Sequence, residues 1–437
     1  MFYDPKIYTL FESQEAEKHI LAFYYAEQET ADLLSRAGAV AVEQSSGTWT
    51  PVPEETEDVR TRSVAHVIGT WEVPDINTIP AVPGDVLRKF VVAIAYPTDN
   101  IGGQFPELLT TLYGNISMVK NLKLLDAFFP KSFIQNFKGP KFGVEGVRKL
   151  TGVPDRPLLV GMFKPCIGAL PDAIGKMFLE MGRGGIDIIK DDELLADPAF
   201  CTVEARVEAC LKANEQVRKE TGRKVLYAVN ITDSPEKMMR KAEKVLKMGN
   251  NMLMIDMFTT GYSVFQDVAA QDWVNVPILG HPAMAGAYYA SPNWGFTAPL
   301  ALGKFVRMAG ADMMIYPSQY GKVPLLRERA IRVAQEQRAP FYHLKPLLPG
   351  PSAGNHPGMM SDMIAEYGAD IIVGAGGGIH GHPEGAAAGC RAFIQAMKAA
   401  MGKFPLRDAA KEHRELRLAL EKWGVTGEGQ KIYDLTR

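Results

Sequence analysis

The sequence predicts an α/β protein whose larger part is a (β/α)8 barrel, preceded by an α+β domain of the ferredoxin-like type. The chain has 437 residues, which is enough for two domains. From about residue 157, short apolar stretches alternate with helical stretches eight times over roughly 245 residues, as in a parallel barrel. Before about residue 150 the elements alternate without a regular repeat. We therefore expect one domain at 1–150 and a barrel domain at 151–437.

In the first domain, residues 19–26, 64–71 and 90–96 are β-rich runs, and residues 30–37 and 106–112 have helical character. A mixed sheet backed by helices fits this order. Residues 137–152, rich in Gly and Lys, lead into the second domain.

In the barrel, the expected strands are residues 157–163, 186–190, 224–230, 251–257, 276–280, 311–316, 339–344 and 370–374. The expected helices are residues 172–181, 203–220, 234–247, 298–309, 325–336 and 384–401. Residues 405–437 form a charged tail, which we expect to be helical and to pack outside the barrel.

Composition narrows the class of function. A hydrophobic content of 46%, a charged content of 22% and a net charge of −2 give no reason to expect nucleic acid or an anionic membrane as a partner. No apolar run approaches the roughly 18 residues of a membrane helix, and the first residues lack a signal-peptide pattern. The four cysteines are widely spaced without a CxxC pair, as in reduced thiols of a cytoplasmic protein. We expect a cytoplasmic enzyme that acts on small molecules.

Active sites of this fold lie where the strands end, at their carboxyl termini. The side chains expected there are Lys164, Cys166, Lys190, Asp192, Glu193, Asn230, Asp256, His281, residues 316–322, Ser352-Ala353-Gly354 and Gly376-Gly377-Gly378.

The second strand carries the most informative stretch. An apolar run ends in Lys190 followed by three carboxylates, and strand alternation puts Lys190 and Asp192 on one side. Charged groups are costly to bury unless they are paired or bound to a metal, so the stretch suggests a hard-cation site. A solvated strand end with a surface salt bridge is the alternative. If the Lys190 amine added CO₂, the carbamate would supply an oxygen ligand, and with Asp192 and Glu193 it would suit Mg²⁺.

Three other groups have two interpretations each. Lys164 could be a proton-transfer base, because burial lowers the pKa of a lysine, or an anion-binding lysine that stays charged. His281 could orient a substrate hydroxyl or act as an acid or base, or it could be structural. Ser352 and the Gly376-Gly377-Gly378 run favour a phosphate site built from backbone N–H groups, although a Gly triplet can also be a tight turn.

These motifs together resemble the ribulose-1,5-bisphosphate carboxylase (RuBisCO) superfamily. The resemblance rests on Lys164-Pro165, the GGxDxxKDDE stretch at 184–193, His281, Gly321-Lys322, Ser352-Ala353-Gly354 and Gly376-Gly377-Gly378. In the first domain, residues 43–49 resemble the family's ESSTGTW segment, and Tyr113-Gly114-Asn115 its asparagine loop. The resemblance spans about residues 20 to 400.

The resemblance implies a head-to-tail homodimer, or a multiple of dimers, with each site between one barrel and the partner's first domain. It implies Mg²⁺ and CO₂ as cofactors, with Lys190 carbamylated and Asp192 and Glu193 completing the metal ligands. Lys164 would be the enolising base or its neighbour. The other implied site residues are His281; Lys322 on the loop after the sixth strand; Ser352, Gly354, Gly376 and Gly377 around a phosphate; and Glu43, Thr48, Trp49 and Asn115 from the partner subunit.

The chain departs from carboxylases at three places. Cys166 replaces a second lysine, Pro282 replaces a phosphate-binding arginine, and residues 315–318 replace a His-rich strand end. Lost charge-assisted hydrogen bonds cost roughly 1.5–3 kcal/mol each, so a bisphosphate should bind poorly. The resemblance therefore implies a RuBisCO-like protein (form IV) that acts on a monophosphate and does not fix CO₂.

Segments near 317–321, 351–358 and 374–385 are similar to the methionine-salvage enolases, which act on 2,3-diketo-5-methylthiopentyl-1-phosphate. However, Asn115 stands where those enolases have a lysine base, and Lys322 is a lysine that they lack. Our hypothesis is decarboxylation of a β-keto acid monophosphate, such as 3-oxo-isoapionate 4-phosphate, to an enediolate stabilised by Mg²⁺. The enolase is the alternative, and a true carboxylase or a non-catalytic binding protein are weaker ones.

Overall fold

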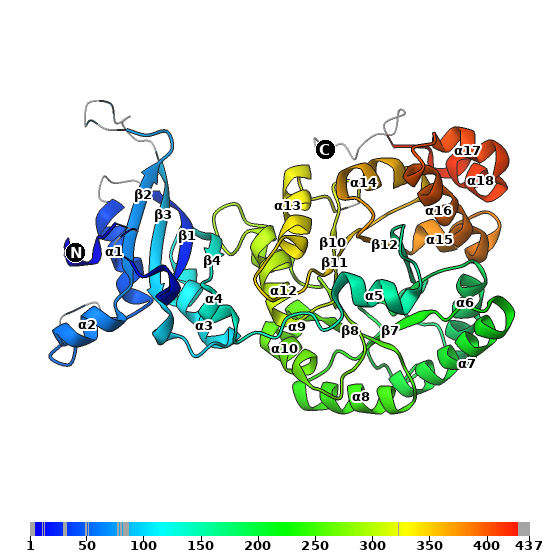
Figure 1. Cartoon of the computed structure of the whole chain (residues 1–437), viewed down its shortest axis with the longest axis horizontal. Helices are drawn as coiled ribbons and strands as arrows, with labels where there is room; N and C mark the ends of the chain where they lie inside the picture. The colour runs from blue at the N-terminus through cyan, green and yellow to red at the C-terminus, as the bar shows by residue number, and fades with distance from the viewer. Residues whose placement is uncertain are drawn as a thin grey trace. The chain divides into compact units, whose positions relative to one another are not determined.

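The computed structural model describes residues 5–10, 12, 14–28, 33–48, 50, 52–76, 78, 81, 87–321 and 323–426. The chain divides into two compact units. The smaller unit comprises residues 1–137 and 284–301, and the barrel unit comprises residues 138–283 and 302–437. Figure 1 labels the elements of both units.

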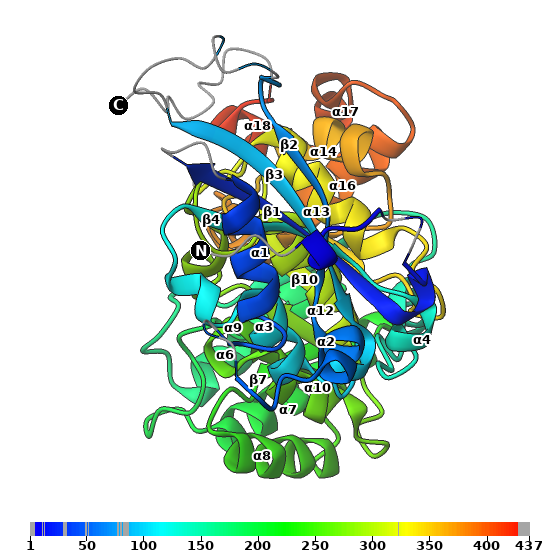
Figure 2. The same cartoon turned by 90° about the vertical axis from the view of Figure 1, so that its left-hand side faces the viewer.

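The smaller unit is built on one sheet, which in the described residues has four strands in the order β2-β3-β1-β4. The strands are β1 (His19–Gln28), β2 (His66–Glu72), β3 (Arg88–Pro97) and β4 (Leu122–Phe128). Every neighbouring pair is antiparallel, so the expectation of a mixed sheet is wrong. β1 and β2 do run parallel to each other, but β3 lies between them, so they do not pair. Burial alternates along most of β1, and α1 (Leu33–Glu43) packs against β2 and β3 (Figure 2).

The other elements of this unit are η1 (Pro5–Ile7), η3 (Ala16–Lys18), α2 (Glu57–Ser63), η5 (Thr98–Asn100), α3 (Phe105–Tyr113), η6 (Asn115–Met118), α4 (Lys131–Ile134) and α11 (Gly286–Tyr289). The helix expected at 30–37 is α1, and its first three predicted residues lie outside the described ones. The strand β4 was not anticipated from the sequence.

The barrel unit confirms the (β/α)8 prediction. Its strands are β5 (Leu158–Met162), β6 (Ile188–Lys190), β7 (Leu226–Asn230), β8 (Met252–Asp256), β9 (Ile278–His281), β10 (Met313–Pro317), β11 (Leu348–Ser352) and β12 (Ile372–Ala375). In the described chain these eight strands form one parallel sheet, in which β12 returns to pair with β5. Side chains from alternate positions, among them Val160, Ile188, Met254 and Leu348, fill the interior.

The barrel is nearly closed, because β11 and β12 lie side by side without a hydrogen-bonded ladder. Leu348 N–H donates toward β10, to Asp312 O, so the alternate residues Pro349 and Pro351 face β12. Proline has no N–H to donate, which explains the missing ladder. The Asn355 amide joins the two strands instead, donating to Pro351 O at 2.9 Å and to Gly374 O at 3.0 Å.

Helices surround the barrel (Figure 1). They are α5 (Gly143–Thr151), α6 (Pro171–Arg183), α7 (Val203–Thr221), α8 (Pro235–Lys247), α9 (Met257–Thr260), α10 (Tyr262–Ala270), the π-helical turn η7 (Leu300–Lys304), α12 (Phe305–Ala309), α13 (Arg327–Arg338), η8 (Pro357–Met359), α14 (Met360–Tyr367), α15 (Gly377–His380), α16 (Gly385–Met401), α17 (Leu406–Glu412) and α18 (Arg414–Trp423). As far as residue 426 the tail is mostly helical, as predicted, and residues 427–437 lie outside the described ones. Glu415 of α18 is held by Arg391 and Gln395 of α16, outside the barrel.

The strand predicted at 339–344 is wrong, since the seventh barrel strand is β11. Phe341 and Leu344 form only an isolated bridge with each other. The prediction failed because the run 339–344 contains the β-formers Phe341 and Tyr342, whereas β11 reads Leu-Pro-Gly-Pro-Ser and has little β propensity of its own.

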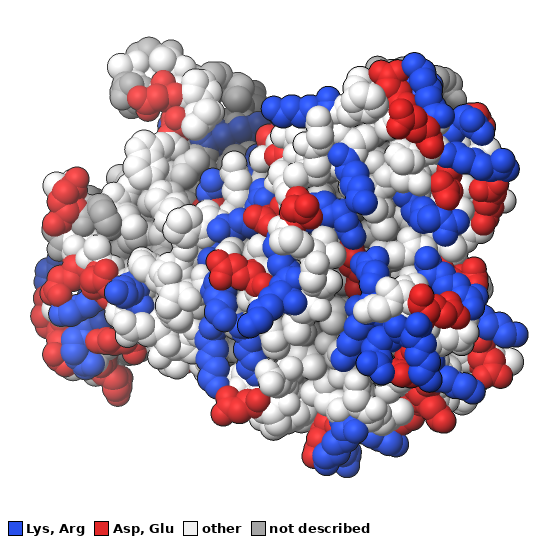
Figure 3. All heavy atoms as spheres, turned by 45° about the vertical axis from the view of Figure 1, so that its right-hand side comes forward, with Lys and Arg blue, Asp and Glu red and all other residues white. Residues whose placement is uncertain are grey.

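The distribution of charged side chains on the surface agrees with the small net charge of the chain. On the face drawn in Figure 3, Lys and Arg side chains are interspersed with Asp and Glu. Among the helices of the described residues, none is both long and apolar enough to cross a membrane.

Candidate active site

The ends of β5, β6, β8 and β9 bring charged side chains together at one mouth of the barrel. Lys190 is the last residue of β6, and its side chain is fully buried. Its Nζ donates to Asp191 O at 2.8 Å and lies 3.4 Å from Glu193 Oε2. The Lys164 Nζ, just after β5, donates to Asp192 Oδ2 at 2.9 Å. The interpretation of this stretch as a solvated strand end is thereby excluded, because Lys190 and Asp192 are both buried.

His281 continues this cluster as the last residue of β9. Its Nε2 lies 3.3 Å from Glu193 Oε2, and its Nδ1 lies 3.5 Å from Asp256 Oδ1. Ala283 N–H donates to Nδ1 at 3.2 Å, so the neutral ring carries its proton on Nε2, facing Glu193. Burial, reinforced by the positive charge of Lys190, holds the pKa of His281 well below its usual value. The imidazole is therefore neutral at physiological pH.

The two nearby carboxyls differ in their protonation. Burial raises the pKa of Glu193, but the charge and hydrogen bond of Lys190, a backbone hydrogen bond and the charge of Lys164 together outweigh it, and the net pKa lies below the usual value. Burial raises the pKa of Asp256 to about 7; Lys190 opposes this shift, and Glu193 adds to it. Glu193 is thus the ionised partner of Lys190, whereas Asp256 holds a proton more readily.

The pKa of Lys164 does not follow the expectation that burial lowers it toward neutrality. Partial burial does lower it, but the hydrogen bonds to Asp192 Oδ2 and to Cys166 Sγ, at 2.9 and 2.7 Å, outweigh this effect. The net pKa lies above the ordinary lysine value. Lys164 is therefore cationic in this arrangement of side chains.

The donor set fits a hard cation. Asp192 and Glu193 supply carboxylate oxygens, and Lys190 lies beside Glu193. In addition, Asp256 Oδ1 is buried and has no hydrogen-bond partner among the described residues. Those residues contain no group of three His, Cys, Asp or Glu side chains placed to hold a metal. A metal site at this position therefore needs Lys190 as a further ligand. An unmodified ammonium group cannot bind a cation, so Lys190 would have to be modified.

The proposed phosphate residues lie at the ends of β11 and β12. Ser352 is buried, and within the described chain its Oγ has no hydrogen-bond partner. Ala353 and Gly354 have positive φ angles of 81° and 113°, which turn the chain sharply after β11. A Cβ at Gly376 would lie 2.8 Å from Lys164 Cε, and one at Gly377 would meet nothing within 4 Å. Because Gly376 has no side chain, Lys164 can lie against the end of β12. Gly377 leaves open space next to Gly376.

The smaller unit brings together two of the residues expected from the partner subunit. Asn115 Nδ2 donates to Glu43 Oε1 at 3.0 Å, joining the start of η6 to the end of α1. Thr48 is held separately, through a 3.1 Å hydrogen bond to Glu55. Trp49 and Lys322 lie outside the described residues.

Comparison with known proteins decides the family. A sequence model of the ribulose bisphosphate carboxylase large chain, catalytic domain, matches residues 143–423, and one of its N-terminal domain matches residues 8–133. This chain belongs to the RuBisCO large-chain family.

Two relatives within this family cover nearly the whole chain. A ribulose bisphosphate carboxylase-like protein of Archaeoglobus fulgidus is 46% identical over 415 residues, which is 94% of both chains. The 2,3-diketo-5-methylthiopentyl-1-phosphate enolase of Geobacillus kaustophilus is 37% identical over 409 residues, 93% of this chain and 98% of that one.

Solved structures of related proteins have the same fold as this chain. The RuBisCO-like protein (MtnW) of Alicyclobacillus acidocaldarius superposes with a TM-score of 0.86 at 40% identity, covering 93% of this chain and 100% of that one. The dimeric archaeal Rubisco of Hyperthermus butylicus superposes with a TM-score of 0.86 at 31% identity, covering 96% and 99%.

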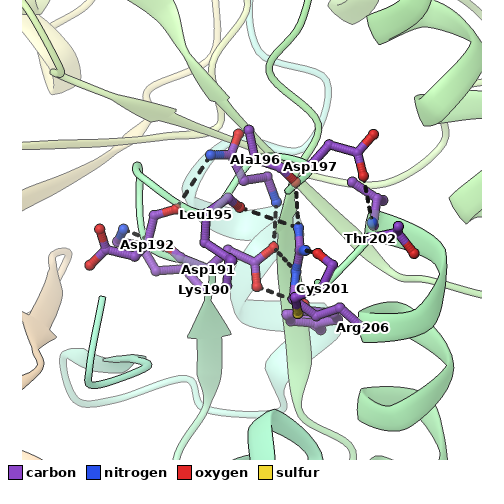
Figure 4. Close-up of polar contacts among 12 residues, drawn as sticks. Lys190, Asp191, Asp192, Leu195, Ala196, Asp197, Cys201, Thr202 and Arg206 are labelled. Carbon is purple, nitrogen blue, oxygen red and sulfur yellow. Dashed lines mark hydrogen bonds and ion pairs between the residues drawn. The ribbon is translucent and has the colours of Figure 1, made fainter. Parts of the chain in front are cut away.

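Sequence reasoning missed Arg206 and its pairing with Asp191, the first carboxylate of the RuBisCO-type KDDE stretch. Asp191 and Arg206 form a fully buried ion pair next to Lys190 and Asp192 (Figure 4). The available signal was helical spacing, because Val203, Val207 and Cys210 define the buried face of α7 and Arg206 lies on it.

Proposed function

We propose that this RuBisCO-family chain is an Mg²⁺-dependent enzyme that forms an enediolate by decarboxylating a β-keto acid monophosphate, such as 3-oxo-isoapionate 4-phosphate. The observation that carries the proposal is the cluster at the barrel mouth. In this cluster Lys164 contacts Asp192, and Lys190 and His281 both contact Glu193.

The carboxylates of Asp192 and Glu193, with Lys190 as its carbamate, would hold the metal. When bound, Mg²⁺ supplies positive charge beside the oxygens on which negative charge develops. The buried Lys190 side chain is directed at Glu193, so the oxygens of a carbamate would extend toward the same space.

The remaining groups would bind and orient the substrate. Ser352 Oγ and the backbone near Gly354, Gly376 and Gly377 would hold the phosphate. The neutral His281 would donate a hydrogen bond from Nε2, as its contact with Glu193 already allows. Lys164, beside Gly376, would pair with an anionic substrate group.

Asn115 favours decarboxylation over enolisation. Breaking the C–C bond to CO₂ leaves the electron pair of the enediolate on the substrate, so no base has to remove a proton. An amide cannot accept that proton, and Asn115 instead donates to Glu43. A lysine base at this position would be needed for enolisation of the kind that the resemblance implies.

The second candidate is enolisation of 2,3-diketo-5-methylthiopentyl-1-phosphate. It is favoured by the enolase of G. kaustophilus at 37% identity and by the MtnW structure at 40%.

The two candidates differ in whether CO₂ is released. Purified protein with Mg²⁺ and bicarbonate would be given the keto acid phosphate and, separately, the diketone phosphate. We expect CO₂ from the former at a rate that Lys190→Met abolishes. Turnover of the diketone without CO₂ release from the keto acid would replace our proposal by the enolase.

We also propose a cytoplasmic homodimer, or a multiple of dimers, in which Glu43, Thr48, Trp49 and Asn115 complete the partner's site. The similar archaeal Rubisco of H. butylicus is dimeric, which supports this assembly. The four cysteines are free among the described residues, and such thiols persist in a reducing compartment.

A further inference from the structure

Two of the three metal ligands of the proposed site lie on the loop between β6 and α7, residues 191–202, called here the ligand loop. Asp192 and Glu193 lie in it, and Arg206 follows it in α7. Arg206 is fully buried, because its position puts it on the inner face of the helix with Val203 and Val207.

The Arg206 guanidinium binds the ligand loop at four points (Figure 4). Nε donates to Asp191 Oδ2 at 2.9 Å, at the start of the loop. Nη1 donates to Cys201 O at 2.8 Å, at its end. Nη2 donates to Leu195 O at 3.3 Å and Ala196 O at 2.8 Å, in its middle. The loop is thus wrapped around one planar group.

Asp191 fastens the same loop to the neighbouring strand β7. Besides Arg206, its carboxylate accepts from Tyr227 OH at 2.7 Å and from Asn230 N–H at 2.9 Å. Both members of the ion pair are completely buried, and each has several hydrogen-bond partners. A buried ion pair of this kind is often no more stabilising than a well-packed apolar pair, so stability alone does not account for it.

The geometry points to a positioning role: we propose that Arg206, through Asp191, sets the metal ligands Asp192 and Glu193 in place. β6 ends at Lys190, but Asp191 N–H continues its pairing with β7 by donating to Ala228 O at 3.1 Å. In extended backbone, successive side chains point in opposite directions, so holding the Asp191 side chain against α7 and β7 turns those of Lys190 and Asp192 to the other side. Lys190 Nζ donates to Asp191 O at 2.8 Å, which couples the third ligand to the same residue. The inference rests on the proposed metal site but not on the identity of the substrate.

The test is Mn²⁺ affinity, with Mn²⁺ as a spectroscopic substitute for Mg²⁺. Free Mn²⁺ would be titrated by electron paramagnetic resonance in the presence of bicarbonate, without substrate. Arg206→Lys keeps the charge but cannot bind three carbonyls and a carboxylate in one plane. We expect its Mn²⁺ affinity to fall about 10- to 100-fold, as for lost outer-shell partners of metal sites.

A matched control exists in the same unit. Arg156 and Asp187 form another buried arginine–aspartate pair, with contacts of 2.6 and 2.9 Å, which binds Leu159 N–H of β5 and not the ligand loop. Asp187 is also bound by Arg223, at 2.7 Å. Arg156→Lys should lower thermal stability while leaving Mn²⁺ affinity unchanged. Asp191→Asn, which retains the shape of the side chain, should weaken Mn²⁺ binding as well, and it decides the question if Arg206→Lys does not fold.

The outcomes are distinguishable. Wild-type affinity in folded Arg206→Lys, or in Asp191→Asn, would overturn the positioning role. So would an equal loss in Arg156→Lys, since the effect would then be general destabilisation. A wild-type protein that binds no Mn²⁺ would overturn the inference together with the proposed metal site. Mn²⁺ binding that depends on Arg206, without CO₂ release from the keto acid, would uphold the inference and refute only the proposed reaction.

Discussion

Gly376 shows how closely single side chains are packed at the barrel mouth. A Cβ there would lie 2.8 Å from Lys164 Cε, too close for contact, so Gly376→Ala should displace Lys164 from Asp192. Because small displacements of catalytic groups are costly, we expect kcat/KM to fall about 10- to 100-fold. The unfolding free energy should change by less than about 1 kcal/mol, because a lysine has other rotamers. Steady-state kinetics and urea unfolding measure the two effects.

A matched substitution separates local crowding from a general effect of alanine. Gly286 in α11 has a negative φ, and its Cβ would meet nothing within 4 Å, so Gly286→Ala should retain wild-type kinetics. Unchanged kinetics in Gly376→Ala would show that Lys164 does not depend on this contact.

Asp312 is the residue for which we predict a pH effect on stability. It is buried in the barrel unit, where Oδ1 accepts from Phe142 N–H and Gly143 N–H, and Oδ2 from Ile278 N–H. Burial raises its pKa from 3.8 to about 6, although the backbone hydrogen bonds oppose the shift. The charged groups that interact with it are Lys345 and Lys141.

The folded-state pKa of Asp312 lies above the unfolded value, so the folded chain binds the proton more tightly. Its contribution to the unfolding free energy is therefore fully present below about pH 4 and is lost as the pH rises through about 6. Relative to Asp312→Asn, the wild type should gain up to about 3 kcal/mol between pH 7 and pH 4. Urea unfolding of both proteins at several pH values measures this difference, and a constant difference would contradict the prediction.

Single residues also mark the limit of what could be predicted from the sequence. Lys190, Asp192, Glu193 and His281 could be placed together because barrel topology brings strand ends to one mouth. The pairing of Asp191 with Arg206 could not, since it depends on the rotation of α7 against β6. The choice between a proton-transfer base and a charged lysine at Lys164 could not be made for a similar reason: its contacts with Asp192 and Cys166 decide its pKa, and burial alone gives the wrong direction.

At the scale of elements, α7 gives a clean test of helix termination. Its last residue, Thr221, is followed by Gly222, which has φ 72° and donates its N–H to Arg218 O at 2.9 Å. A Cβ there would meet nothing within 4 Å, so only backbone strain opposes a side chain. Gly222→Ala should lower the unfolding free energy by about 1–2 kcal/mol. Gly402, which ends α16 with φ −76°, is the control, and its alanine variant should be nearly neutral. Equal effects at both positions would refute the role of φ.

The elements that the sequence predicted well are those with a strong local signal. Strands such as β8, with five buried residues, and helices such as α7 could be placed within a few residues. By contrast, β11 is a strand because β10 pairs with it, despite its two prolines. The short helix α9 follows β8 directly at Asp256, so no turn-forming residues in the sequence indicate where the strand ends and the helix begins.

At the scale of the whole molecule, the proposed shared site predicts complementation between two inactive variants. Glu43→Gln keeps an oxygen that can accept the Asn115 hydrogen bond but removes the carboxylate charge. Lys190→Met removes the amine from a buried position while filling its space. If each site combines one chain's barrel unit with the partner's smaller unit, each homodimer has two defective sites.

A hybrid of these two variants places both defects in one site and leaves the other native. Random assembly makes half of the dimers hybrids, so co-expression should restore about a quarter of wild-type activity. If each site lay within a single chain, the hybrid would contain no native site and no activity would return. A second purified hybrid, of the double variant Glu43→Gln/Lys190→Met with the wild type, should behave in the opposite way. If the site is shared, each site contains one defect and the hybrid is inactive. If the site lies within one chain, the wild-type chain keeps its site and the hybrid has half of the wild-type activity. The two hybrids must therefore give opposite results, and agreement between them would refute the shared site.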